Sequence, residues 1–106
     1  MTTKERAYLK SIAQTTDPVL SLGKASLTPE FVEAASEALK ARELIKVNVL
    51  KNCVDDPHTL AITLSERTRS EVVQVIGRKI VLYKRNHDNI KIVFPGEKVK
   101  KVDKKK

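Results

Sequence analysis

The chain has 106 residues, with 21 Lys or Arg against 13 Asp or Glu, and therefore a formal net charge of +8. This length suits one small domain, and 41% hydrophobic residues is too many for a disordered chain. No apolar run reaches the ~18 residues that a membrane span requires. The single cysteine, Cys53, excludes an internal disulfide framework, and with only His58 and His87 beside it a closed zinc site of Cys and His is excluded too. We expect a soluble, cytoplasmic α/β protein that is monomeric and has no cofactor.

Half of the net charge lies at the C-terminus. The last ten residues contain six lysines and two acids, Glu97 and Asp103, which leaves +4. These residues follow Pro95-Gly96 and lack apolar periodicity. We expect one domain over residues 1–96 and a basic, disordered tail over residues 97–106, which serves solubility, nonspecific attraction to phosphate, or both.

The N-terminal segment predicts a helix followed by a short strand. Thr2-x-x-Glu5 has the spacing of a capping box, and apolar residues recur at helical intervals as far as residue 14. Residues 19–22 are short, apolar and compatible with a strand that ends at Gly23.

The middle of the chain predicts helix, strand and helix. Thr28-Pro29-Glu30 reads as an N-cap, a proline at the first helical position and an acid in the first turn, so a helix should run to Arg42. Residues 44–50 alternate between apolar and polar side chains, which predicts a strand with one wet face. Asp55-Asp56-Pro57 begins a third helix, to about residue 70, by the same capping logic.

The C-terminal part predicts a hairpin. Residues 72–76 and 80–84 are rich in β-branched side chains and are joined by Gly77-Arg78-Lys79. Residues 90–94 are expected to add a last short strand or an edge segment. The element order indicates an α/β fold, a compact mixed sheet of about four strands with three helices packed on it.

No motif in the chain supports an enzyme. A glycine-rich nucleotide loop, a nucleophile elbow and a metalloprotease HExxH pair are all absent from the sequence. Asp55 and Asp56 are explained by capping of the following helix, and His58 and His87 are expected to be exposed.

The loop from Gly23 to Thr28 is the strongest candidate for binding. It joins a strand to a helix N-terminus and carries Lys24, so backbone N–H groups and a positive charge can face an anion. The alternative is an ordinary turn in which Gly23 supplies a positive φ. Other basic residues either form one surface with this loop or are scattered over the protein: Lys46, Lys51, Arg78, Lys79, Lys84 and Arg85.

Three segments together resemble one family. They are LGKASLT at 22–28, ELIKV at 43–47 and VQVIGRKIVLYKR at 73–85, the last being the most specific. They are similar to the CRM domain (chloroplast RNA splicing and ribosome maturation), and most closely to its stand-alone bacterial YhbY-like form. The resemblance covers roughly residues 3–95 and implies an α/β fold similar to the C-terminal domain of translation initiation factor 3.

The resemblance also implies a site. The family's RNA-contacting loop has a GxxG pattern, like that of KH domains, that clamps the nucleic-acid backbone. Gly23 matches its first glycine and Lys24 a middle position, whereas Ser26 replaces the second glycine. A serine hydroxyl can donate to phosphate, but the backbone approaches less closely than at glycine. We expect RNA binding by Gly23, Lys24, Ser26, Lys46, Arg78, Lys79, Lys84 and Arg85, with Tyr83 as either a core residue or a stacking platform.

The implied function is binding of structured ribosomal RNA in large ribosomal subunit assembly, without catalysis. The lack of a leader and of additional domains favours this bacterial role over organellar intron splicing. An alternative is a protein-interaction module of a translation or ribosome-assembly complex, with lysines serving solubility. Binding to DNA is a further alternative, because phosphate contacts do not distinguish the two nucleic acids.

Overall fold

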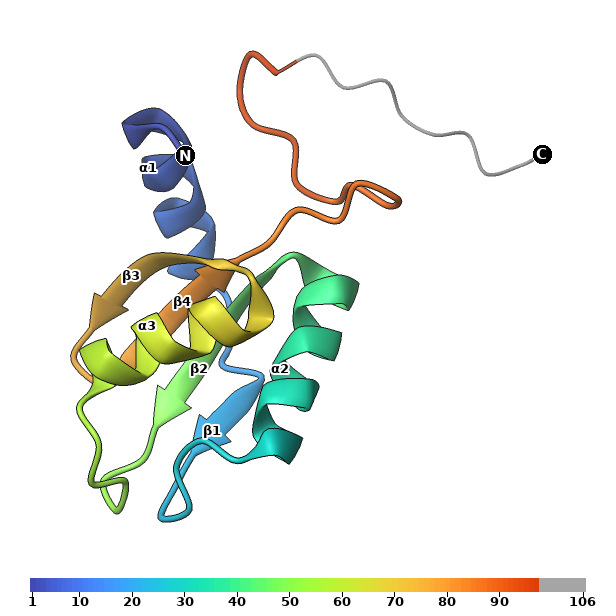
Figure 1. Ribbon diagram of the computed structural model, residues 1–106. Helices are drawn as coiled ribbons and strands as arrows, with labels where there is room; N and C mark the ends of the chain where they lie inside the picture. The colour runs from blue at the N-terminus through green and yellow to red at the C-terminus, as the bar shows by residue number, and fades with distance from the viewer. Residues whose placement is uncertain (98–106) are drawn as a thin grey trace.

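A computed structural model describes residues 1–97, which fold as three helices and a four-stranded mixed sheet (Figure 1). This confirms the expected fold class. In chain order the elements are α1 (Thr3–Ala13), β1 (Leu20–Leu22), α2 (Pro29–Arg42), β2 (Leu44–Val49), α3 (Pro57–Thr68), β3 (Glu71–Ile76) and β4 (Lys79–Tyr83). No helix within residues 1–97 is long and apolar enough to cross a membrane.

The sheet order, β1-β2-β4-β3, decides which loops are neighbours. β1 runs parallel to β2, and β4 is antiparallel to both β2 and β3. The carboxyl ends of β1 and β2 therefore lie at the same end of the sheet as the turn between β3 and β4. Three loops meet at this end, which is the lower end in Figure 1.

The main core lies between one face of the sheet and the pair α2 and α3. Its fully buried side chains include Leu22, Leu39 and Ile45. Cys53 is buried in the same cluster, as expected for a small apolar side chain after a strand. Each helix begins as its sequence predicts: Thr2 and Glu5 form a reciprocal capping box for α1, while Thr28 and Asp56 cap α2 and α3.

The other face of the sheet is only half covered. α1 packs there with Leu9 and Ala13 against Leu44 and Val81. Beyond the end of α1, Lys46 and Asn48 on β2 are half-buried and not enclosed in a core. The expected wet face of this strand therefore begins at Lys46, because Leu44 on the same face is buried under α1.

Of the two alternatives expected for residues 90–94, a last short strand or an edge segment, the strand is wrong. The segment 84–97, called the strap below, has no strand, and the buried side chain of Glu43 holds it in place instead. The Glu43 carboxylate accepts from the backbone N–H groups of Asn86, Lys91 and Ile92 at 2.7 to 2.9 Å. These donors are thereby satisfied without a neighbouring strand.

Aromatic contacts and an ion pair hold the far end of the strap. Phe94 packs edge-on against Tyr8 and Tyr83. The Arg85 guanidinium lies 5.4 Å from the Phe94 ring centroid and pairs with Glu97 through both of its terminal nitrogens. Glu97, expected as the first residue of the tail, is thus bound to the fold, while the rest of the predicted tail, 98–106, lies outside the described residues.

The Arg85–Glu97 pair should make stability depend on acid pH. The Arg85 hydrogen bond, together with the Phe94 N–H, lowers the pKa of Glu97 from 4.5 to about 2. Between these values the unfolded chain binds more protons than the folded chain, so the free energy of unfolding should fall as the pH falls. Urea unfolding of wild type and Glu97→Gln should show a difference near pH 5 that shrinks toward pH 2. A difference that is equal at both pH values would contradict this role.

Candidate nucleic-acid interface

Backbone hydrogen bonds join the three loops at the lower end of the sheet. The Leu50 N–H donates to the carbonyl of Leu22 at 2.8 Å, which ties the start of the 50–56 loop to the start of the 23–28 loop. The Val49 N–H donates to the carbonyl of Arg78 at 2.7 Å, which brings the β3–β4 turn alongside. Positions 24, 51 and 78 are far apart in sequence but follow or flank these bonds, so they share one end of the molecule.

The 23–28 loop begins with a tight turn. The Ser26 N–H donates to the Gly23 carbonyl at 3.0 Å, leaving Lys24 and Ala25 exposed at the tip. Gly23 does not have a positive φ, so the alternative of an ordinary turn in which Gly23 supplies one is wrong on this point. A Cβ at Gly23 would meet side-chain atoms of Leu50 and Asn52 at 3.6 Å, an ordinary contact distance. A Cβ would therefore fit at Gly23, and neither the backbone conformation nor the space requires glycine at this position.

Ser26 adopts the left-handed conformation instead, with φ 56°. The Ser26 hydroxyl donates to the Asp55 carboxylate at 2.6 Å. The Cys53 sulfur lies 3.8 Å from the Ser26 hydroxyl oxygen. The hydroxyl that was expected to reach phosphate is thus engaged with Asp55. Ser26 positions the loop against its neighbour, at a φ that glycine adopts without strain.

Arg78 ties the hairpin to the 50–56 loop. Its guanidinium donates to the carbonyls of Val49 and Leu50 at 3.0 and 2.8 Å, and to that of Cys53 at 3.4 Å. These neutral acceptors leave its positive charge uncompensated at an exposed position. Arg78 therefore both supports the loop and contributes charge.

The N-terminus of α2 offers less to an anion than expected. Pro29 has no N–H, and the Phe31 N–H donates to the Thr28 hydroxyl at 3.0 Å. Glu30 adds a negative charge in the same turn. An anion at this loop would rely chiefly on Lys24 and on the backbone of the turn tip.

We define the basic end as the four exposed cations that these loops carry: Lys24, Lys51, Arg78 and Lys79. Two acids share it, but each is directed at a protein donor: Asp55 accepts from Ser26, and Asp56 accepts from the first amides of α3. The two carboxylates keep their negative charge, so the four cations and these two acids together give this end a net charge of +2, with no ion pair to any of the four cations within residues 1–97.

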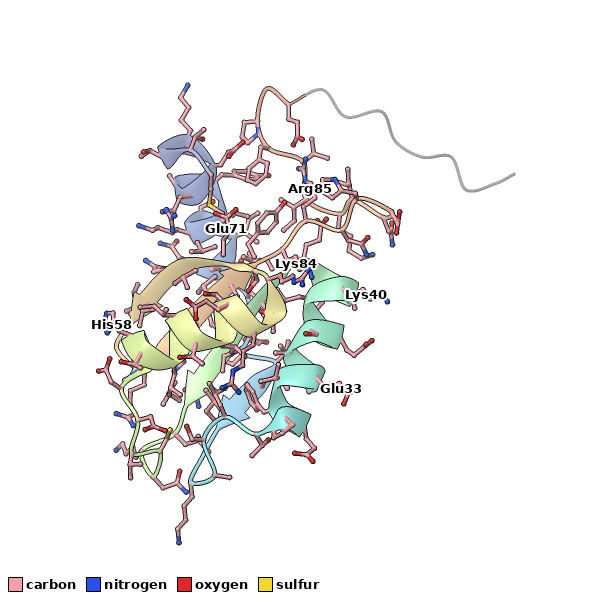
Figure 2. The ribbon with its side chains drawn as sticks, in the orientation of Figure 1. Glu33, Lys40, His58, Glu71, Lys84 and Arg85 are labelled. Carbon is pink, nitrogen blue, oxygen red and sulfur yellow. The ribbon has the colours of Figure 1, made fainter. Side chains whose placement is uncertain are left out.

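The structure separates Lys84 and Arg85 from the other predicted site residues. β4 runs away from the basic end, and its five residues place Lys84 about 16 Å from Lys79 along the strand. Lys84 donates to the Thr68 carbonyl at 3.1 Å, and Arg85 is held by Glu97. Figure 2 shows both at the start of the strap, at the opposite end of the molecule from the 23–28 loop. A single surface containing all the predicted cations is therefore not formed.

Tyr83 is also no stacking platform. Its side chain is buried, packs edge-on against Phe94 and accepts a hydrogen bond from Arg85. Burial is the main cause of its raised pKa. His58 and His87 are exposed, as expected.

The fold adds Asn52, which the sequence did not single out, and brings it together with Lys51, which the sequence names only among the basic residues that either join the 23–28 loop or are scattered. Because β1 and β2 are parallel neighbours, the loop that carries both residues lies beside the 23–28 loop, with the Asn52 side chain close to Gly23. The signal for Asn52 in the sequence is its position shortly after an alternating strand.

Comparison with known proteins shows which family has this sequence and fold. A model of the CRS1/YhbY (CRM) domain matches residues 1–84, from α1 through β4. The chain belongs to this family. The probable RNA-binding protein YqeI from Bacillus subtilis is 41% identical over 95 residues, which cover 90% of this chain and 99% of the relative. An RNA-binding protein from Haemophilus influenzae is 33% identical over 95 residues, covering 90% of this chain and 95% of that protein.

A solved structure agrees with the CRM fold. The solution structure of the hypothetical protein SAV1595 from Staphylococcus aureus matches with a TM-score of 0.75 and 45% sequence identity. The match covers 90% of this chain and 99% of that one. The family match ends at residue 84, so most of the strap lies beyond it.

Proposed function

We propose that this CRM protein binds structured RNA through the basic end and acts, without catalysing a reaction, in assembly of the large ribosomal subunit. The observation that carries the proposal is the convergence of Lys24, Lys51, Arg78 and Lys79 from three loops onto one end, with no ion pair to any of them within residues 1–97. The names of the relatives from Bacillus subtilis and Haemophilus influenzae support RNA as the partner.

Backbone contacts should dominate the affinity. Lysines and the exposed tip of the 23–28 turn suit phosphate oxygens, which position a protein on RNA but do not read its sequence. The buried Tyr83 removes the one candidate for aromatic stacking near the hairpin. Selectivity should therefore come from RNA shape more than from sequence.

A filter-binding titration with ribosomal RNA fragments tests the proposal. Four phosphate contacts at the basic end predict an affinity at least about 50-fold lower in 200 mM than in 50 mM salt. Duplex DNA of equal length, used as competitor, should displace the RNA less well than unlabelled RNA does. Absence of RNA binding, or an affinity that salt does not change, would overturn this mechanism.

The protein-interaction alternative makes a different prediction. If the chain joins a ribosome-assembly complex through protein contacts alone, its co-sedimentation with large-subunit particles should survive ribonuclease treatment. The net positive charge of the basic end favours RNA, so we expect ribonuclease to release the protein.

A further inference from the structure

The half of the second sheet face that α1 leaves uncovered contains a small cavity. Its volume is about 140 Å³. Four elements contribute to it: the end of α1, β2, β3 and β4, through Ala13, Gln14, Lys46, Gln74, Ile76, Lys79 and Val81. None of these side chains takes part in the loop contacts described above, and the cavity lies on the face opposite α2 and α3.

Strand register explains why these side chains converge. Lys46 pairs with Val81 across β2 and β4, and Gln74 pairs with Val81 from the other side. Lys79 lies opposite Ile76 in the same sheet. Paired residues point to one face, so two ammonium groups and a carboxamide surround an apolar floor. Gln14, at the C-terminal end of α1, brings a second carboxamide.

The side chains that line the cavity fit a ligand with a flat, hydrogen-bonding ring and an attached anionic group. Val81 and Ala13 are buried floor residues, while Ile76 is 60% exposed and forms an apolar wall. Carboxamides both donate and accept, as recognition of a base edge requires. The lining carries two positive charges and no acid. An apolar protein side chain would offer neither a charge to the two lysines nor a hydrogen bond to the two carboxamides.

The size and the position of the cavity limit which ligands it can bind. Pockets for drug-sized ligands have volumes of about 300–1,000 Å³, so this cavity suits a single ring system and not a larger ligand. Lys79 belongs both to the cavity and to the basic end, and Arg78 precedes it directly. A nucleic-acid strand held at the basic end would pass this cavity next.

We infer that this cavity is a subsite for one unpaired RNA nucleotide, whose base lies on Val81 beside Gln14 and Gln74 and whose phosphate is bound by Lys46 and Lys79. The inference rests on the proposed function and deepens it, because a splayed base gives the protein a preference for unpaired over fully paired RNA.

Two RNAs with equal numbers of phosphates test the subsite, a hairpin with an unpaired loop and a fully paired duplex. Wild type should bind the hairpin about tenfold more tightly, and Gln14→Met combined with Gln74→Met should abolish that preference while leaving duplex affinity unchanged. Methionine preserves length and removes the hydrogen-bonding groups. The control is Thr59→Met, at an exposed position of α3 on the other side of the sheet. This variant should behave like wild type.

Crosslinking provides a readout that does not depend on a variant. With 4-thiouridine in the hairpin loop, irradiation of wild-type complexes should attach RNA to the peptide spanning residues 74–81. Equal wild-type binding of hairpin and duplex would overturn the subsite and leave the proposed function standing, whereas failure to bind either RNA would overturn the proposed function itself. Crosslinks confined to other peptides, or an undiminished preference in the double variant, would also overturn the subsite.

Discussion

Replacing Lys24, Lys51 and Lys79 together by alanine should weaken RNA binding about 100-fold at 0.1 M salt. At the value for single strands, the lower of the two known for nucleic acids, each lysine that neutralises a phosphate contributes a salt slope of about 0.7, which equals about fivefold in affinity at that concentration. The slope of log affinity against log salt should therefore fall by about 2. Titrations of wild type and the triple variant at four or five salt concentrations measure both quantities.

The matched control removes the same charge from the other end of the molecule. Lys4, Lys40 and Lys91 are exposed and lie on α1, on α2 and in the strap, and Figure 2 shows Lys40 on the helix end nearest the strap. Their replacement by alanine should lower the affinity much less, because phosphate bound at the basic end lies farther from them than the ~8 Å screening length at physiological salt. An equal loss from both triple variants would show that net charge alone, and not the basic end, attracts RNA.

Replacing Glu43 by alanine should destabilise the fold by about 3–5 kcal/mol. The change leaves the backbone donors of Asn86, Lys91 and Ile92 without their charged acceptor, and hydrogen bonds to charged groups contribute about 1.5–3 kcal/mol each. The total stays below a simple sum because part of the strap can detach and hydrate its amides. Urea unfolding followed by circular dichroism measures the change, and amide exchange at positions 91 and 92 should speed up.

Two further variants locate the effect in the carboxylate. Glu43→Gln retains one acceptor oxygen and should fall between wild type and alanine. Glu37→Ala, at an exposed position on α2, should change the free energy of unfolding by less than about 0.5 kcal/mol. Unchanged amide protection at Lys91 and Ile92 in Glu43→Ala would mean that the carboxylate does not hold the strap.

The buried Glu43 also shows where sequence reasoning reached its limit. Glu43 lies next to an apolar strand, and nothing in the neighbouring sequence indicates that its side chain is buried. Nothing there indicates its positive φ of 68° either. Its partners lie 43 to 49 residues away in a segment whose apolar residues suggest a strand. A carboxylate that replaces a strand as the hydrogen-bond partner can be identified only when both segments are placed in space.

The candidate site was also predicted only in part from the sequence. The sequence identified Lys24, Arg78 and Lys79, and the structure brings them to one end. Sequence reasoning also grouped Lys84 and Arg85 with them, as basic residues near the same hairpin that could share one surface. Lys79 and Lys84, however, are five residues apart along the strand and its end, which separates them by about 16 Å. This exceeds the ~8 Å over which exposed charges interact strongly at physiological salt.

By itself, the sequence determined the type and order of the helices and strands, the caps that begin the helices, and the family. Those features depend on residues a few positions apart: Thr2 with Glu5, Thr28 with Pro29, and apolar side chains at alternating positions in β2. Only the tertiary structure decided which cations converge, that Ser26 is held by Asp55, and that Gln14 and Gln74 share a cavity with Lys46. These depend on strand order and register, because pairing between distant segments sets the direction and neighbours of each side chain.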